Sequence, residues 1–323
     1  MRIGSLFTGA GGLDMAVEQV TGASPAWFVE FDPNPSKVLA RHWLSVPNYG
    51  DVTAVNWKEV AEVAPVDILT AGYPCQPFSH AGKRKGSKDE RHLWPYVADA
   101  IGALRPRLVV LENVAGHLSL GGSAVVGDLA RLGFDARWGV VRASDAGAAH
   151  QRKRLFIVAA DTSSGQQSWP ATAGNGLPVA AQRGHIAVAL LPTPVVNDMG
   201  AGKTVDDWDA WTGRMRDAHG HGNGHGHGHG KSLAIEAQRD FGTYQAAIDR
   251  WTRVIGRPAP DPTVPGKNGP RLSARFCEWL MGWPDGWVTD TDGISHSAAL
   301  KICGNGVVPQ QAVLALDLLG VQL

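Results

Sequence analysis

The fold is decided by residues 71–79, which read Ala71-Gly72-Tyr73-Pro74-Cys75-Gln76-Pro77-Phe78-Ser79 and follow the apolar run 66–70. A β-branched run that ends at glycine and proline is typical of a buried strand that stops abruptly. The two prolines flanking Cys75-Gln76 fix backbone angles, so we expect the Cys75 thiol to be displayed on a stiff loop. A lone cysteine is also commonly a small buried hydrophobe. The position after a strand favours a functional role, because open α/β sheets bind ligands beyond the carboxyl ends of their strands.

Length and composition exclude several classes of protein. The 323 residues are 44% hydrophobic, which suffices for a large core and a second, smaller domain. We expect a cytoplasmic protein, because no apolar run is long enough to span a bilayer and the first residues lack a signal-peptide pattern. Three widely spaced cysteines indicate neither a disulfide framework nor a CxxC metal site. Lys plus Arg equals Asp plus Glu at 30 each, so net charge argues neither for nor against nucleic acid.

A glycine-rich turn follows the first predicted strand, Arg2 to Phe7. It reads Thr8-Gly9-Ala10-Gly11-Gly12 and precedes a helical pattern, which is typical of a nucleotide-binding crevice, although a plain tight turn has the same appearance. A dinucleotide fingerprint would require glycine at position 14, where this chain has Asp14, so NAD is the weaker prediction.

Other acidic residues also stand at strand ends. Glu30 follows the predicted strand 26–29, at the spacing where ribose hydroxyls are usually bound, and Asp51 could accept a hydrogen bond from an adenine amino group. Either carboxylate could instead be simply solvated. Glu112 ends another apolar run, 107–111. A parallel sheet would bring the glycine turn, Glu30, Cys75 and Glu112 to one edge.

Two basic segments complete this part of the chain. Residues 80–91 are glycine-hinged and rich in cations, which suits a loop touching phosphates, although a solvated charge run is the alternative. In the predicted strand 150–159, alternation would direct Arg152 and Arg154 to one face and Lys153 to the other.

The composition changes between Ala160 and Pro270, where Gly, Pro, Ser and Gln dominate and the strand and helix alternation disappears. We interpret this as a second domain. Its His/Gly-rich tract, residues 219–230, is predicted to be a flexible loop and not a metal site, because its glycines supply no preorganisation. We expect Trp208, Trp211 and Trp251 to form a small core. In the following helical pattern, 271–287, Cys277 falls on the apolar side.

Eight blocks in this order resemble the DNA (cytosine-5)-methyltransferase family of bacterial or phage type. They are the turn from Phe7 to Gly12, Glu30, Asp51, the Pro-Cys-Gln loop, Glu112-Asn113-Val114, Arg152 with Arg154, the 271–287 block, and Gly304-Asn305-Gly306-Val307. One departure is His150, where the family usually has glutamine. The resemblance implies an α/β fold with a Rossmann-like S-adenosylmethionine-dependent methyltransferase sheet, helices on both faces, and a smaller irregular target-recognition domain. The predicted boundaries are 1–159 for the catalytic domain, 160–270 for target recognition, and 271–323 for a connecting helix and the return to the catalytic domain.

The resemblance also implies roles for individual residues. Cys75 would attack cytosine C6, Glu112 would donate a proton near N3, and Arg152 and Arg154 would favour the thiolate. S-adenosylmethionine would be the cofactor, S-adenosylhomocysteine its product, and no metal is expected. The partner would be double-stranded DNA with a flipped-out target cytosine, and the protein a monomer in the cytoplasm of a bacterial or phage-infected cell, in the setting of restriction-modification. The implied cofactor-binding residues are Phe7, Gly9, Gly11, Gly12, Glu30, Phe31, Asp51, Val52, Gly72, Pro74, Leu93, Asn305 and Val307.

Three other functions compete with this prediction. The same chemistry on tRNA is disfavoured by the long insert, and a catalytically silent DNA-binding relative is disfavoured because every chemical position is filled. An NAD oxidoreductase is disfavoured by Asp14.

Overall fold

The computed structural model describes residues 1–74, 93–164, 188–219, 231–267 and 269–321, which belong to two compact units. The first unit comprises Met1–Ala146, Lys153–Arg183 and Gly306–Leu323, and the second comprises Gly147–Arg152 and Gly184–Asn305. This division differs from the predicted one. Residues 271–305, which we expected to connect back to the first domain, pack within the second unit, and only the segment from Gly306 returns.

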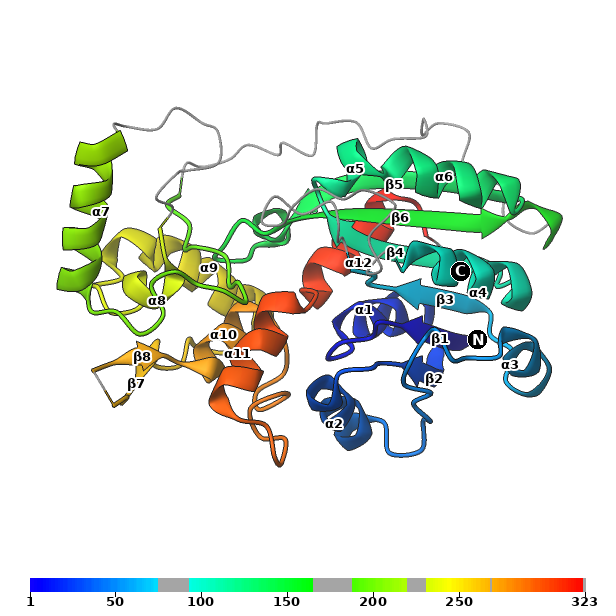
Figure 1. Ribbon diagram of the computed structural model, residues 1–323, viewed down its shortest axis with the longest axis horizontal. Coiled ribbons are helices and arrows are strands. Elements are labelled where there is room, and N and C mark those ends of the chain that lie inside the picture. Colours follow the sequence, from blue (N-terminus) through cyan, green and yellow to red (C-terminus); the bar gives the residue numbers. More distant parts are fainter. Residues whose placement is uncertain (75–92, 165–187, 220–230, 268, 322–323) are drawn as a thin grey trace. The chain divides into compact units, whose positions relative to one another are not determined.

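The first unit is built on a six-stranded sheet in the order β2-β1-β3-β4-β6-β5 (Figure 1). The first four strands run parallel, as predicted, while β6 pairs antiparallel with both β4 and β5. The strand bounds are β1 Arg2–Leu6, β2 Ser24–Val29, β3 Ile68–Ala71, β4 Leu108–Val114, β5 Phe134–Arg142 and β6 Lys153–Asp161.

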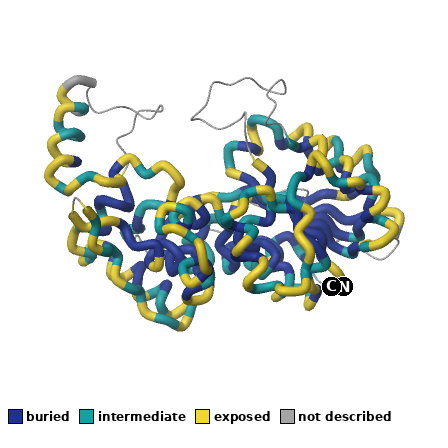
Figure 2. Tube along the Cα trace, turned by 60° about the horizontal axis from the view of Figure 1, so that its bottom comes forward, coloured by how far each residue is buried: buried dark blue, intermediate teal, exposed yellow. Residues whose placement is uncertain are grey.

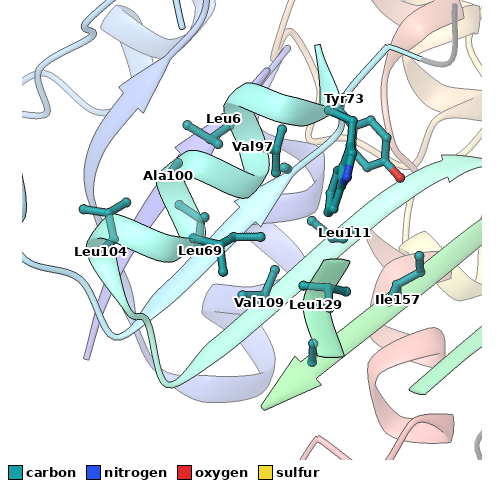
Figure 3. Packing of buried hydrophobic residues seen from close by; sticks show 14 of the residues in the cluster. Leu6, Leu69, Tyr73, Val97, Ala100, Leu104, Val109, Leu111, Leu129 and Ile157 are labelled. Carbon is teal, nitrogen blue, oxygen red and sulfur yellow. The ribbon is translucent and has the colours of Figure 1, made fainter. Parts of the chain in front are cut away.

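Helices cover both faces of this sheet. On one face α3, α4 and α6 pack against Leu69, Val109 and Ile157 (Figure 3). On the other, α1 and α12 pack against Ile68 and Val110, so that the strands are buried from both sides (Figure 2). The helix bounds are α1 Gly12–Thr21, α2 Pro33–His42, α3 Trp57–Val63, α4 Trp94–Leu104, α5 His117–Leu120, α6 Gly122–Arg131 and α12 Pro309–Leu318, with 3-10 turns at Ala143–Ala146 and Thr162–Ser164.

A buried amide and apolar packing hold the C-terminal tail within the first unit. Gln311, on α12, donates from Nε2 to the carbonyl of Val141 on β5 over 2.8 Å. Apolar residues of α12 pack with α1 in the same core cluster. The C-terminal helix α12 is therefore part of the first unit.

The second unit is mainly helical and has a tryptophan-rich core. Trp251, Phe276 and Trp279 are fully buried, and Trp251 Nε1 donates to the Trp279 carbonyl over 2.9 Å. Trp208 is also buried, whereas Trp211 is half-buried. The elements are α7 Val205–His219, α8 Leu233–Glu236, α9 Gln245–Ile255, α10 Ala274–Leu280, α11 His296–Asn305, a 3-10 turn at Gly242–Tyr244, and a two-stranded sheet of β7 Thr263–Val264 and β8 Arg271–Leu272.

Several predictions concern residues outside the described ranges. They are Cys75 with the rest of its loop, the basic segment 80–91, and residues 220–230 of the His/Gly-rich tract. Across the described ranges, no helix is both long and apolar enough to span a membrane.

Candidate active site

The ends of the four parallel strands form a row across the first unit. In the strand pairing, Leu6 lies opposite both Val29 and Ala71, and Ala71 lies opposite Leu111. The residues that come next in each strand or loop are Phe7, Glu30, Gly72 and Glu112. The predicted convergence at one sheet edge is therefore confirmed for these positions.

The glycine turn has a backbone conformation that few other residues would adopt. Gly9 has φ 58° and Gly11 has φ 81°, and Phe7 also lies in the left-handed region at φ 53°. A Cβ added to Gly9 would meet no atom within 4 Å, whereas one on Gly11 would lie 2.6 Å from the Trp43 ring. Gly9 therefore leaves open space beside the backbone, as a bound ligand requires, while Gly11 permits packing.

Glu30 accepts backbone hydrogen bonds with both carboxylate oxygens, one of them from this turn. Oε2 accepts the Gly9 N–H over 2.8 Å, and Oε1 accepts the Asp32 N–H over 2.8 Å. Asn48 supports Glu30 from the next segment, since its Oδ1 accepts the N–H groups of Glu30 and Gly50. Sequence reasoning missed Asn48. Its signal is an Asn-x-Gly turn directly before Asp51.

The remaining residues near this turn have different surroundings. Phe31 is 77% exposed and Val52 is buried. Asp51 Oδ1 accepts both the N–H and the hydroxyl of Thr53, and these hydrogen bonds lower the pKa of the Asp51 carboxyl. An ionised carboxylate at Asp51, an anchored one at Glu30 and the open backbone at Gly9 fit a ligand with an adenosine group.

Glu112 forms an ion pair with Arg154 across the β4 and β6 pairing. Arg154 Nε lies 2.8 Å from Glu112 Oε1, and the two side chains are 17% and 10% exposed respectively. Arg154 lies opposite Val114, so it shares a sheet face with Glu112 two residues away. The β3 exit is adjacent, because a Cβ on Gly72 would lie 3.7 Å from Glu112 Oε2.

Arg152 does not share this arrangement, so the predicted pairing of its guanidinium with that of Arg154 on one strand face is wrong. Strand β6 begins at Lys153, and Arg152 precedes it with φ 30°. Its Nη1 donates to the Pro194 carbonyl over 3.1 Å and its Nη2 to the Gly304 carbonyl over 3.0 Å, within the second unit. Strand alternation could not apply to a residue outside the strand.

Other predicted site residues are distributed between the units. Pro74 follows β3, Leu93 caps the start of α4, and Val307 is buried in the cluster around α1 and α12. Asn305 is the exposed last residue of α11, in the second unit. The structure thus places Val307 with the first-unit residues and Asn305 with Arg152.

A buried carboxyl lies beneath the glycine turn. Asp14, on α1, accepts hydrogen bonds from the hydroxyls of Thr70 at 2.7 Å and Ser5 at 3.0 Å. Burial raises the pKa of the Asp14 carboxyl to about 7, against the opposing effect of these hydrogen bonds. Asp14 is therefore a buried structural group of the first unit, as well as the residue that breaks a dinucleotide fingerprint.

The two described cysteines are buried and free. Cys277 lies on α10, on the apolar side as predicted, and Cys303 lies on α11. Burial raises the pKa of both thiols above the usual value for cysteine, which makes them poor nucleophiles. This leaves Cys75 as the candidate nucleophile. In the described part of the chain no group of three His, Cys, Asp or Glu side chains could hold a metal ion.

A cavity of about 440 Å³ lies beside the β3 exit in the first unit. Its lining includes Tyr73, Pro74, Trp94 and His117, together with residues of α6. Pro74 is the one predicted cofactor residue in this lining, and the other lining residues are Tyr73 and members of the range 94–132. Tyr73 and His117 were missed by sequence reasoning, because their contact joins segments 44 residues apart.

Comparison with known proteins gives one family match. The model of a family described as C-5 cytosine-specific DNA methylase matches residues 1–315. The chain is 27% identical over 304 residues to the "Type II methyltransferase M.NaeI" of Lentzea aerocolonigenes, covering 89% of this chain and 68% of that protein. It is 42% identical over 127 residues to the "DNA N-6-adenine-methyltransferase" of Escherichia phage P1, covering 36% of this chain and 17% of that protein. The chain thus spans only a small part of the phage protein.

The fold has solved counterparts. The crystal structure of S. pombe Dnmt2 methyltransferase superimposes with a TM-score of 0.61 at 15% identity, covering 99% of this chain and 100% of that one. At this identity the likeness concerns the fold, and it supports the predicted α/β methyltransferase architecture.

Proposed function

The chain belongs to the C-5 cytosine-specific DNA methylase family, and we propose that it transfers a methyl group from S-adenosylmethionine to C5 of a flipped-out cytosine in a specific double-stranded DNA sequence. The observation that carries this proposal is the ion pair of Glu112 and Arg154, directly beside the strand exit that leads to Cys75. We further propose that the protein acts as a monomer in the cytoplasm of a bacterial or phage-infected cell.

The cofactor would be held by the first-unit strand ends. Glu30 would bind ribose hydroxyls, Asp51 would accept from the adenine amino group, and the backbone at Gly9 would allow close approach. When bound, S-adenosylmethionine supplies an electrophilic methyl group on a sulfonium centre. The other proposed contacts are Phe7, Gly11, Gly12, Phe31, Val52, Gly72, Pro74, Leu93, Asn305 and Val307.

Cys75 would start the reaction by attacking the cytosine ring. Its thiolate forms a bond to C6, because C5 is a poor nucleophile until a group adds there. A free thiol is only a few per cent ionised at neutral pH, so the cation of Arg154 would help by favouring the thiolate. The electron pair released from the 5,6 double bond then becomes available at C5.

Glu112 would balance the charge that the addition places on N3. A guanidinium at 2.8 Å stabilises the carboxylate form, so in this proposal Glu112 takes up its proton as the base enters and Arg154 turns toward the base. The Glu112 carboxyl then donates that proton at N3. After C5 is methylated, C5 loses its proton to solvent. N3 then returns its proton to the Glu112 carboxylate as the bond between sulfur and C6 breaks, which restores the 5,6 double bond and the neutral base.

Extruding the base requires compensation. Unstacking a cytosine costs a few kcal/mol, and we propose that the basic segment 80–91 and the second unit offset that cost through contacts with phosphates and neighbouring bases. The second unit is then the target-recognition part, which residues 188–219 and 231–305 would supply.

A single methyl-transfer assay distinguishes cytosine in duplex DNA from two other substrates, tRNA and adenine in DNA. Transfer of a tritiated methyl group should be measured on duplex DNA and on tRNA, with digestion of the product to identify the modified base. We expect 5-methylcytosine in duplex DNA. Label confined to tRNA would establish the RNA alternative, and N6-methyladenine, the product named for the phage P1 relative, would contradict a thiol-dependent mechanism.

A further inference from the structure

Tyr73, two residues before Cys75, is held by three segments from elsewhere in the first unit. Its carbonyl accepts from Asn113 Nδ2 over 3.1 Å, and its hydroxyl shares a 2.9 Å hydrogen bond with His117 Nε2. Its ring packs on Trp94 with the centroids 5.3 Å apart. Figure 3 shows Tyr73 at the edge of the apolar cluster that also contains Val97 and Leu111.

Each of these partners is itself fixed. Trp94 opens α4, and its Nε1 donates to Asp128 Oδ2 on α6 over 2.6 Å. Asn113 lies on β4 next to Glu112 and is buried. His117 opens α5 and is 3% exposed. The backbone that leaves β3 is thereby fastened to β4, α4 and α5.

Packing alone does not require this hydroxyl. A phenylalanine would fill the same volume, and a buried hydroxyl is unfavourable unless it is hydrogen-bonded. The rings of Tyr73 and His117 meet edge to face, at 78° between planes, so the shared hydrogen bond fixes the direction of the tyrosine side chain. Fixing direction matters most where the next residues must place a reacting atom.

We propose that Tyr73 and His117 are positioning residues for the Cys75 nucleophile. The inference rests on the proposed function of Cys75. The hydrogen bond between the two side chains holds the chain at the β3 exit, immediately before Pro74, so that the sulfur reaches C6 in the geometry required for attack. A small displacement of a reacting atom can reduce a rate by about 100-fold.

The test compares Tyr73→Phe with Tyr244→Phe. Tyr244, in the second unit, is a matched control. Its side chain is only 2% exposed, so it is not among the surface residues that would contact DNA, and its hydroxyl makes partly buried hydrogen bonds to Glu236 at 2.5 Å and Lys231 at 2.8 Å. Both substitutions remove one hydrogen-bonded hydroxyl and should lower the melting temperature by similar amounts. The first-turnover rate of methyl transfer to duplex DNA, KM for both substrates, and the melting temperature should be measured for each.

For Tyr73→Phe we expect the first-turnover rate to fall about tenfold, with KM for DNA and cofactor within about twofold. Tyr244→Phe should keep the wild-type rate within about twofold. His117→Gln, which retains a hydrogen-bonding atom near the Nε2 position, should restore most of the rate that His117→Leu loses. A wild-type rate in Tyr73→Phe, with a melting temperature lowered as in the control, would overturn the inference.

A second measurement separates failure of this inference from failure of the proposed function. Absence of methyl transfer by the wild type to both duplex DNA and tRNA would refute the proposed function. The alkylation rate of Cys75 by iodoacetamide, followed by mass spectrometry without nucleic acid, still reports on positioning. A change of about threefold or more in Tyr73→Phe, but not in Tyr244→Phe, supports the inference, and equal rates in all three proteins contradict it.

Discussion

Arg152 and Arg154 are separated by a single residue but serve two different regions. Arg154 lies on a strand and directs its guanidinium to the carboxylate of Glu112. Arg152 lies before the strand and directs its guanidinium to the backbone carbonyls of Pro194 and Gly304. The comparison shows that of two arginines so close in sequence, one can pair with a carboxylate while the other holds backbone segments together.

The hydrogen bonds of Arg152 join several backbone segments of the second unit. Its N–H also donates to Thr193 Oγ1 over 3.1 Å. Gly304 lets the chain approach closely, because an added Cβ would lie 2.6 Å from the Val196 nitrogen. Arg152 ends the six-residue segment Gly147–Arg152, which belongs to the second unit. Arg250 binds the start of this segment by donating hydrogen bonds to the carbonyls of Gly147 and Ala148. Gly147–Arg152 is therefore fixed to the second unit at both ends.

The largest effect is expected on the Arg154 side of the comparison. Glu112→Gln should reduce the first-turnover rate of methyl transfer by about 10²-fold to 10⁴-fold, since an amide cannot pass a proton to N3. DNA affinity, measured by fluorescence anisotropy, should change by less than about threefold. Retention of more than a tenth of the wild-type rate would contradict the role proposed for Glu112.

The next prediction concerns Asp14, a buried carboxyl that is hydrogen-bonded to hydroxyl groups, whereas Glu112 is paired with a guanidinium. The pKa of Asp14 rises from 3.8 to about 7 on folding, so the unfolded chain releases this proton first and stability falls as pH rises between these values. The loss is at most about 4 kcal/mol, at about 1.4 kcal/mol per pKa unit. Urea denaturation at pH 5 and pH 8 should therefore show a smaller stability difference for Asp14→Asn than for the wild type. An unchanged difference would show that Asp14 does not titrate in this range.

Arg152→Met tests the other side of the comparison. It leaves the carbonyls of Pro194 and Gly304 without these donors, at about 1–3 kcal/mol for each buried group. Hydrogen exchange should speed up in peptides from residues 188–219 and 269–305, and Arg154→Met should leave those peptides unchanged. Equal hydrogen-exchange rates in the two variants would contradict the claim that Arg152, and not Arg154, stabilises these segments.

The smallest effect is expected from metal removal. Glycine-rich spacing gives the histidines of residues 219–230 no preorganisation for a metal ion, so EDTA should leave the rate of methyl transfer unchanged. A loss of activity that added zinc restores would revive the metal interpretation of that segment.

How much the sequence predicts depends on whether a residue's partner is local. The alignment of Glu30 and Glu112 along one sheet edge was predicted correctly, because an apolar run followed by a carboxylate can be recognised in a sequence and parallel strands align their ends. Arg152 was misplaced because strand alternation was extended three residues too early, and its acceptor at Gly304 is 152 residues away. Tyr73, Asn48 and His117 gave no periodic signal, since their importance arises only from contacts made after folding. The division of the tail at Gly306 was missed for the same reason.

The central claim is that the Cys75 sulfur bonds to a cytosine, and trapping on DNA tests it most directly. A duplex carrying 5-fluorocytosine at the methylated position, incubated with the protein and S-adenosylmethionine, should give a stable adduct because fluorine cannot leave C5 as the proton does. Mass spectrometry of the digested adduct should locate the DNA on Cys75, and Cys75→Ser should form none. Absence of an adduct, or attachment through Cys277 or Cys303, would contradict the account.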